Sequence, residues 1–276
     1  MLLMNPVPEN AAEKRKKPKR KTTRTEKRMK RSLWVLAAVL FCVFLAGLFA
    51  YLRFEKAEKG HHDPLWLPFE SSKSMAVSCP ELIPGYDGKD VVILTENRPL
   101  FTLRDINTLK GEQYTELDLL GRCGPAAVLL DRTMMPREER GYIGMIEPSG
   151  WEQAKYPGLV DSDPPYLYNR CHLISYALTG QNANERNLIT GTRHMNADGM
   201  LPYEIAVIQY LEKTGNHVLY RVTPYFMGRE LLARGVEMEA YSIEDEGRGL
   251  SFHVFVYNCQ PGVEIDYLTG ASFRTE

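Results

Sequence analysis

The chain has 276 residues, of which 44% are hydrophobic and 25% are charged. This length suits one well-buried domain of about 150–200 residues with appendages, and it excludes two large domains. The formal net charge of −1 is an average over two opposite segments. Residues 1–32 contain twelve Lys or Arg and three Glu, which gives +9, so the remaining residues carry −10.

An uncharged run of 21 residues, Ser32–Leu52, follows the basic tail of residues 1–32. A helix needs about 20 apolar residues to cross a bilayer, so residues 33–52 are predicted to form a transmembrane signal anchor. The cationic side chains predict a cytoplasmic N-terminus and an extracytoplasmic remainder. Two alternatives stay open. The basic tail could be a disordered arm that binds nucleic acid, and the apolar run could be a cleaved signal peptide, although such peptides usually have a shorter apolar core.

Residues 53–84 mix Lys, Glu, Ser and Pro without periodicity and are predicted to be a linker. The folded domain is expected over residues 85–276. Its first element is a short strand at Val91–Leu94, an apolar run bounded by Gly88 and Asn97.

One helix is predicted to begin near Pro202 and to end at Gly215. Its expected apolar face repeats at helical spacing and consists of Leu201, Ile205, Ile208 and Leu211.

Three strands are predicted after this helix, at Val218–Thr223, Gly235–Ser242 and Leu250–Tyr257. The second alternates apolar residues with Glu237 and Glu239, which predicts one buried face. The turn residues between the second and third strands predict an antiparallel hairpin. The fold class is therefore α+β with a mostly antiparallel sheet.

Five cysteines are present, of which Cys42 falls in the predicted span. The other four would face an oxidising space, and the sequence leaves their pairing open: Cys79, Cys123, Cys171 and Cys259. The absence of a CxxC pair argues against a structural zinc site.

The segment from Asn169 to Asn196 concentrates residues that phosphodiester hydrolysis requires, namely a base, a cation ligand and phosphate donors. His172 is the candidate base, because a neutral imidazole accepts a proton near pH 7. Asn196 offers a neutral oxygen that suits Mg²⁺. Arg170 lies two residues before His172, on the same side of a strand, and could grip a phosphate.

Five further residues are expected to support this site. Asn187 would orient the base or the loop that carries Asn196. Glu204 would act near the ion, with an interaction with the helix dipole as the alternative. Basic residues must surround the substrate because the domain is acidic overall, and the candidates besides Arg170 are Arg186, Arg193 and Arg221. Each of these residues also has an ordinary structural explanation.

Cys171 next to His172 allows a thiol nucleophile as an alternative. Neighbours in a strand point to opposite faces, however, so Cys171 is expected to face the core or a disulfide partner, for which Cys123 is the candidate.

The motif Asn169–His172, followed by Asn187, Asn196 and Glu204, resembles the DNA/RNA non-specific endonucleases of the ββα-metal (His-Me finger) type. Their signature is Asp-Arg-Gly-His, then an Asn, a second Asn nine residues later and a Glu eight residues beyond. Both later spacings are kept here. Tyr220–Phe226 resembles the family strand after the helix, and Tyr142–Trp151 resembles the strand before the motif.

The likeness covers roughly residues 85–270 and has two departures. Asn169 replaces the usual Asp, which removes a negative charge beside Arg170. Cys171 replaces Gly, which argues that this position needs no positive φ.

The resemblance implies a ββα-metal nuclease core and a membrane-anchored enzyme similar to DNA-entry nucleases. Such an enzyme would cut DNA and also RNA with little sequence preference, and its ion would be Mg²⁺, with Mn²⁺ as the alternative. By resemblance His172 is the general base, Asn196 binds the ion and Arg170 contacts phosphate, with Asn187 and Glu204 in support. Two other functions stay open: an inactive nucleic-acid-binding protein, and a hydrolase that depends on Cys171. Protein partners, oligomeric state and biological role are not readable.

Overall fold

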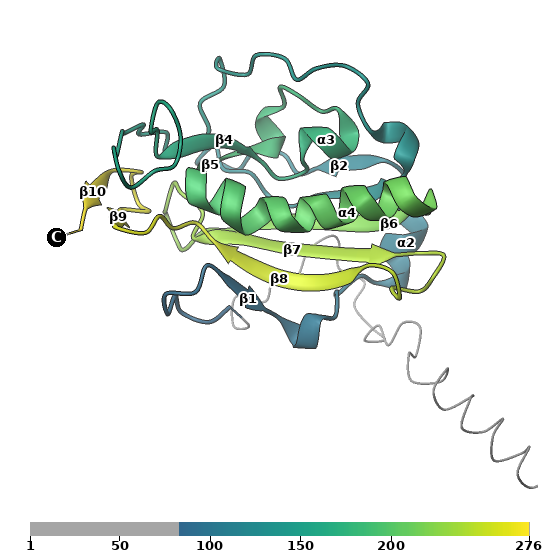
Figure 1. The fold of residues 1–276 in the computed structure, drawn as a ribbon. Coiled ribbons are helices and arrows are strands. Elements are labelled where there is room, and N and C mark those ends of the chain that lie inside the picture. Colours follow the sequence, from purple (N-terminus) through teal and green to yellow (C-terminus); the bar gives the residue numbers. More distant parts are fainter. Residues whose placement is uncertain (1–82, 276) are drawn as a thin grey trace, which may run out of the picture. The chain divides into compact units, whose positions relative to one another are not determined.

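The computed structural model describes residues 83–275 (Figure 1). The predicted basic tail, the predicted transmembrane segment and nearly all of the predicted linker lie outside the described residues. Among residues 83–275, no helix is both long enough and apolar enough to cross a bilayer.

An antiparallel six-stranded sheet, in the order β1-β8-β7-β6-β3-β2, forms the centre of the domain. Its strands are β1 (Val91–Ile93), β2 (Glu112–Tyr114), β3 (Ala126–Leu130), β6 (Val218–Tyr225), β7 (Gly235–Ser242) and β8 (Ser251–Tyr257). The predicted hairpin is present, because β7 pairs with β8 from Gly235 opposite Tyr257 to Tyr241 opposite Ser251. The α+β class with an antiparallel sheet is therefore confirmed.

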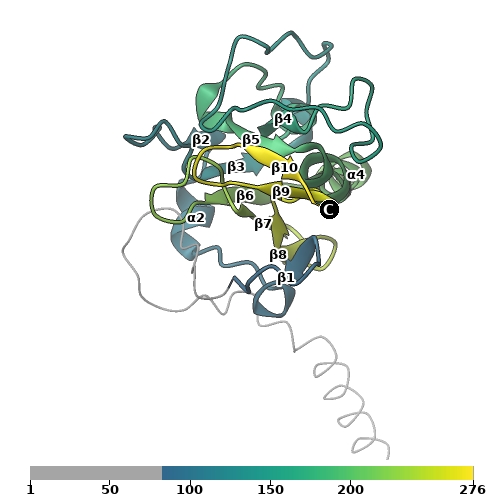
Figure 2. The same cartoon turned by 90° about the vertical axis from the view of Figure 1, so that its left-hand side faces the viewer.

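A second unit consists of a hairpin followed by a helix, and it lies on one face of the sheet (Figures 1 and 2). The hairpin pairs β4 (Tyr168–His172) with β5 (Leu188–Thr192). A π-helical turn, η5 (Met195–Met200), then leads directly into the helix α4 (Leu201–Thr214). This β4-β5-α4 order is the ββα arrangement that the motif predicts.

The remaining elements are short and lie around these two units. They are η2 (Thr95–Asn97), α2 (Leu103–Thr108), η3 (Arg132–Met134), α3 (Tyr176–Thr179), η4 (Glu185–Asn187), β9 (Val263–Ile265) and β10 (Ser272–Arg274). The last two strands form a separate antiparallel hairpin.

The main core lies between the sheet and the β4-β5-α4 unit. Val222, Met238 and Val254 from the sheet are fully or almost fully buried there in one cluster with Val207 and Leu211 of α4. The opposite face of the sheet is covered by the segment around α2, where Phe101 and Leu109 pack against Ala127 and Leu219. Both faces of the sheet are thus removed from water.

The buried face of α4 differs from the prediction. Leu201 and Ile205 are 42% and 41% exposed, whereas Glu204 and Val207 are buried. Residues three and four apart line up on more than one side of a helix. In α4 the side that faces the sheet carries Glu204, Val207 and Leu211. The predicted end of the helix is confirmed, because Gly215 caps it with φ of +71°.

The expectation that β7 buries only one face is wrong. Glu237 and Glu239 are 3% and 1% exposed, so the face that carries them is buried as well. Their charges are paired inside the protein: Glu237 lies 2.6 Å from His253 Nε2, and Glu239 pairs with Arg221. Alternation of apolar and acidic residues cannot reveal such partners on neighbouring strands.

The strand expected at Tyr142–Trp151 is also not present, because this segment is an irregular loop. Its sequence contains Gly144, Pro148 and Gly150, and Gly150 has φ of +68°, which a strand residue does not adopt. This loop lies beside β4 and contributes to the candidate site.

Candidate active site

His172 is the last residue of β4, and its ring nitrogens have different partners. Nε2 lies 2.8 Å from the backbone carbonyl of Asn182, and Nδ1 lies 3.2 Å from a guanidinium nitrogen of Arg140. A carbonyl only accepts hydrogen bonds and a guanidinium only donates them. The imidazole is therefore neutral, with its proton on Nε2 and a lone pair on Nδ1.

The surroundings of His172 favour this neutral form. Burial lowers the pKa of His172 to about 4, and the positive charge of Arg140 acts in the same direction. At neutral pH the ring is therefore available as a proton acceptor, as a general base must be.

Asn187 holds the backbone that follows the histidine. It is completely buried, accepts a hydrogen bond from the Ile174 N–H at 2.8 Å and donates one to the Ile174 carbonyl at 2.9 Å. This amide pairing fixes the chain two residues beyond His172. Of the two roles expected for Asn187, the geometry corresponds to support of the base.

Asn196 lies in the π-helical turn η5 and is joined to β4 through Cys171. The Cys171 thiol donates a hydrogen bond to Asn196 Oδ1 at 3.0 Å. Asn196 is thus held by a hydrogen bond to the residue of β4 that directly precedes His172. Oδ1 keeps a second lone pair for an ion.

Glu204, in the first turn of α4, is 7% exposed. Burial raises the pKa of its carboxyl group to about 7, while a hydrogen bond with Ser175 and the charge of Arg140 oppose this shift. A carboxyl group whose pKa is close to neutral pH loses its proton readily when a cation binds nearby.

Arg140 is the functional candidate that the sequence analysis missed. It donates to His172 Nδ1, and its charge also reaches Glu204 and Cys171. It lies in an irregular segment 32 residues before His172, and neither periodicity nor motif spacing marks it. The only signal is the run of charged residues at positions 137–140.

Arg170 anchors the 142–151 loop. Its guanidinium donates to the carbonyl of Gly144 at 2.8 Å and to that of Ile146, and it lies 4.2 Å from the centre of the Trp151 ring. The loop is thus fixed to β4 beside the histidine. A contact between Arg170 and phosphate stays a prediction.

The other three arginines have different environments. Arg186 is at the surface, 2.7 Å from Glu116, and Arg193 is half-buried. Arg221 is only 4% exposed and pairs with Glu239 on the face of the sheet covered by the α2 segment. The expectation that Arg221 lines the substrate surface therefore does not fit its position, because β6 directs it into a buried ion pair.

The cysteines Cys123, Cys171 and Cys259 are all free thiols, so the candidate pairing of Cys123 with Cys171 is wrong. Cys123 instead lies 3.2 Å from the carbonyl of Leu188. Cys171 is completely buried, which raises the pKa of its thiol well above the usual value. A protonated thiol without solvent access is a poor nucleophile.

The residues around Asn196 fit a hard divalent cation. The candidate donors are the Asn196 amide oxygen and the Glu204 carboxyl group, both of which interact with Cys171. Mg²⁺ prefers a few such oxygens and retains several waters. The thiol of Cys171 remains protonated and holds the amide rather than competing for the ion.

Comparison with known proteins agrees with this geometry. A family model described as DNA/RNA non-specific endonuclease matches residues 103–244. A deoxyribonuclease from Streptococcus dysgalactiae subsp. equisimilis is 32% identical over 110 residues, which are 38% of this chain and 32% of that protein. The chain thus spans about a third of the length of this curated relative.

Solved structures show the same fold. NucA from Streptococcus agalactiae, with a magnesium ion bound, matches with a TM-score of 0.58 and 26% identity over 67% of this chain and 88% of that one. Sda1 nuclease with a bound zinc ion matches with a TM-score of 0.55 and 24% identity, over 67% of this chain and 96% of that one.

The matched region contains the whole β4-β5-α4 unit, with His172, Asn196 and Glu204 in the order and spacing described above. It extends over more than half of the chain, so the chain belongs to the DNA/RNA non-specific endonuclease family.

Proposed function

We propose that this protein is a metal-dependent endonuclease that hydrolyses phosphodiester bonds of DNA, and also of RNA, with little sequence preference. The observation that carries the proposal is the buried, neutral imidazole of His172 at the end of β4, with the Asn196 amide oxygen hydrogen-bonded to the preceding residue, Cys171. Family membership supplies the substrate class, and the NucA structure with bound magnesium favours Mg²⁺ as the ion.

In the proposed reaction His172 Nδ1 takes a proton from the attacking water. The Asn182 carbonyl holds the Nε2 proton and so keeps the lone pair on Nδ1. The new bond forms between the water oxygen and phosphorus, the bond to the 3′ oxygen breaks, and a 5′ phosphate end remains. Bound Mg²⁺ would supply positive charge to the phosphate and the leaving oxygen.

Arg140 and the supporting groups have defined roles in this scheme. When substrate enters, the Arg140 guanidinium releases its hydrogen bond to His172 Nδ1 and donates to a phosphate oxygen instead. The charged phosphate oxygen is the stronger hydrogen-bond acceptor. Asn196 would hold the ion through Oδ1, and an ionised Glu204 would supply negative charge near it. Asn187 keeps the backbone beyond His172 in place.

The proposed location is the outer face of a membrane, with the chain anchored by residues 33–52. The support is the sequence pattern alone, namely the basic segment followed by an uncharged run of 21 residues.

Two other functions are tested by the same experiment. An inactive nucleic-acid-binding protein has the Asn169 departure in its favour, and a thiol hydrolase is disfavoured by the buried, protonated Cys171. The full-length chain, purified in detergent, is incubated with plasmid DNA or RNA in Mg²⁺, with and without chelator, next to its Cys171→Ser variant.

The proposal predicts cutting that chelator abolishes and that Cys171→Ser largely retains, since a hydroxyl can also donate to Asn196 Oδ1. Binding without cutting in Mg²⁺ would show the inactive protein. Hydrolysis that survives chelator but not Cys171→Ser would show the thiol enzyme, and either result contradicts the proposal.

A further inference from the structure

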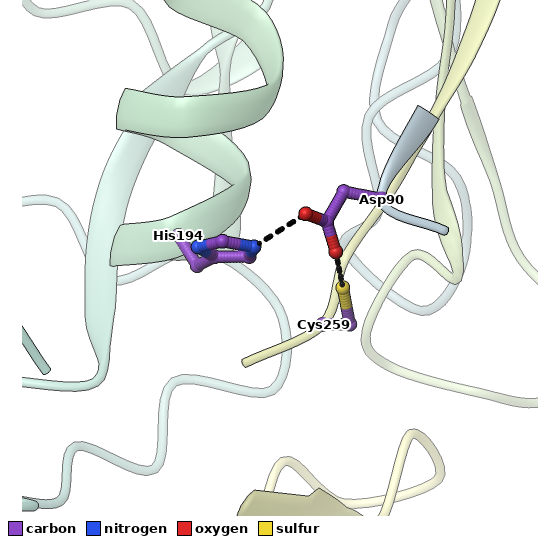
Figure 3. Close-up of side chains that lie close together, drawn as sticks. All are labelled: Asp90, His194 and Cys259. Carbon is purple, nitrogen blue, oxygen red and sulfur yellow. Dashed lines mark hydrogen bonds and ion pairs between the residues drawn. The ribbon is translucent and has the colours of Figure 1, made fainter. Parts of the chain in front are cut away.

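Three side chains from distant parts of the sequence meet at the end of β8, beside the turn that carries Asn196 (Figure 3). They are Asp90, which directly precedes β1, His194, which follows β5, and Cys259, which follows β8. Their potential ligand atoms all lie within 4.8 Å of one another. The proposed nuclease mechanism uses none of them.

Hydrogen bonds to backbone carbonyls fix the position of the three segments. The Tyr257 N–H donates to the Asp90 carbonyl at 2.9 Å, which holds Asp90 beside the end of β8. Thr192 donates from its hydroxyl to the Cys259 carbonyl at 2.6 Å, which holds the turn before His194 against the same strand end. The backbone that carries the three side chains is therefore positioned by the fold.

The imidazole of His194 is oriented as it is in metal sites. Its Nδ1 lies 2.8 Å from the carboxylate of Asp198, which keeps the proton on Nδ1 and a lone pair on Nε2. A carboxylate behind the ring is the usual partner of a histidine that binds a metal through its other nitrogen.

The other nitrogen of His194 lacks a satisfactory partner. Nε2 is 2.9 Å from Asp90 Oδ2, yet it is inaccessible to solvent and makes no hydrogen bond within the described part of the chain. With the proton on Nδ1, Nε2 and the Asp90 carboxylate present lone pairs to each other at this distance. A cation between them would satisfy both.

We propose that Asp90, His194 and Cys259 form a second cation site, distinct from the site at Asn196 and suited to Zn²⁺ rather than Mg²⁺. A thiolate and an imidazole favour zinc and other soft transition metals, whereas Mg²⁺ prefers oxygen alone. Ligand atoms of a tetrahedral zinc site are roughly 3.3–3.8 Å apart, so small side-chain movements suffice. The Cys259 proton leaves to solvent on binding.

Such a site would connect three segments that are far apart in the sequence, namely the residues before β1, after β5 and after β8. Asp90 is 41% exposed, so an ion can enter from solvent, and water can take the fourth position. An ion here would fix the chain before β1 to the turn two residues before Asn196. Spacing rules miss this site because its ligands are separated by 104 and 65 positions in the sequence.

The test is the absorption spectrum of the full-length chain, freed of metal by chelator and titrated with Co²⁺ as a probe. The proposal predicts a thiolate-to-cobalt charge-transfer band that Zn²⁺ removes and excess Mg²⁺ does not. Cys259→Ser should lose the band and His194→Gln should weaken or lose it. Cys123→Ser, which changes another buried free thiol, should keep it.

Thermal unfolding provides a second readout that is independent of DNA cleavage. Zn²⁺ should raise the Tm of the wild-type chain but not that of Asp90→Asn or His194→Gln. The proposal is overturned if no thiolate band forms, or if the band persists in Cys259→Ser. It is also overturned if Zn²⁺ leaves the wild-type Tm unchanged while Asp90→Asn lowers it in chelator, which would show a metal-free ion pair between His194 and its two carboxylates.

Discussion

Burial shifts both titratable groups of the candidate site toward their neutral forms. It lowers the pKa of His172 to about 4 and raises that of Glu204 to about 7. At neutral pH the base is therefore unprotonated, and the carboxyl group is close to half ionised. Here burial moves the pKa values of a base and an acid in opposite directions. Such a pair is typical of sites in which one residue accepts a proton and the other stabilises charge.

The raised pKa of Glu204 predicts a cost in stability that an ion would remove. A carboxyl group whose pKa is higher in the folded state stabilises the fold at low pH, and this contribution is lost as pH rises from about 4.5 through 7. Glu204→Gln should abolish this dependence. In chelator at pH 8 the variant should be more stable than wild type by on the order of 2–3 kcal/mol in urea denaturation, yet cut DNA more slowly in Mg²⁺. A variant less stable than wild type under these conditions would contradict this explanation.

The motif residues could be identified from the sequence because local spacing encodes them. His172, Asn187, Asn196 and Glu204 follow one another within a single hairpin and helix, so the order along the chain alone assigns them to one ββα unit. Arg140 and the Asp90–His194–Cys259 cluster could not be predicted in this way. Their contacts depend on how loops and strand ends far apart in the sequence pack together.

At the scale of elements, strands and helix ends were predictable, and the solvent exposure of their faces was not. Gly235–Ser242 is a strand as expected, and Gly215 ends the helix as expected. The predicted exposure of Glu239 and the predicted burial of Leu201 are both wrong. A residue pattern describes one element, whereas exposure depends on what packs against that element.

The buried pair of Arg221 and Glu239 should matter for folding and not for substrate binding. These side chains are 4% and 1% exposed, so removing one leaves the other charge buried without its partner. Arg221→Ala should lower the free energy of unfolding by about 3–5 kcal/mol in urea denaturation. The KM for DNA of the folded fraction should stay unchanged. A raised KM with normal stability would contradict this prediction and show that Arg221 binds substrate.

At the scale of the whole molecule, the acidic charge bears on how substrate is attracted, and the predicted anchor bears on where the protein is located. Everything after residue 32 carries −10, so basic groups near the site must attract the substrate against the average field. Cleavage by such an enzyme depends on local phosphate contacts rather than on long-range attraction.

The anchor prediction concerns residues outside the described part of the chain. The full-length protein should remain in the membrane fraction after an alkaline wash, and removal of residues 33–52 should release it. Added protease should reach the nuclease domain in intact cells. A mature chain whose mass begins after the apolar run would show a cleaved signal peptide instead.

The central claim is that His172 and Asn196 act together at one ion, and single-turnover cleavage of DNA by the full-length chain tests it most directly. His172→Ala should lower the rate by roughly 10²–10⁴-fold at saturating Mg²⁺, and Asn196→Ala should also lose cleavage and need more Mg²⁺ for what remains. His217→Ala, which alters a half-exposed histidine paired with Glu244, serves as the matched control and should cut normally. Rates close to wild type in either His172→Ala or Asn196→Ala would contradict the account.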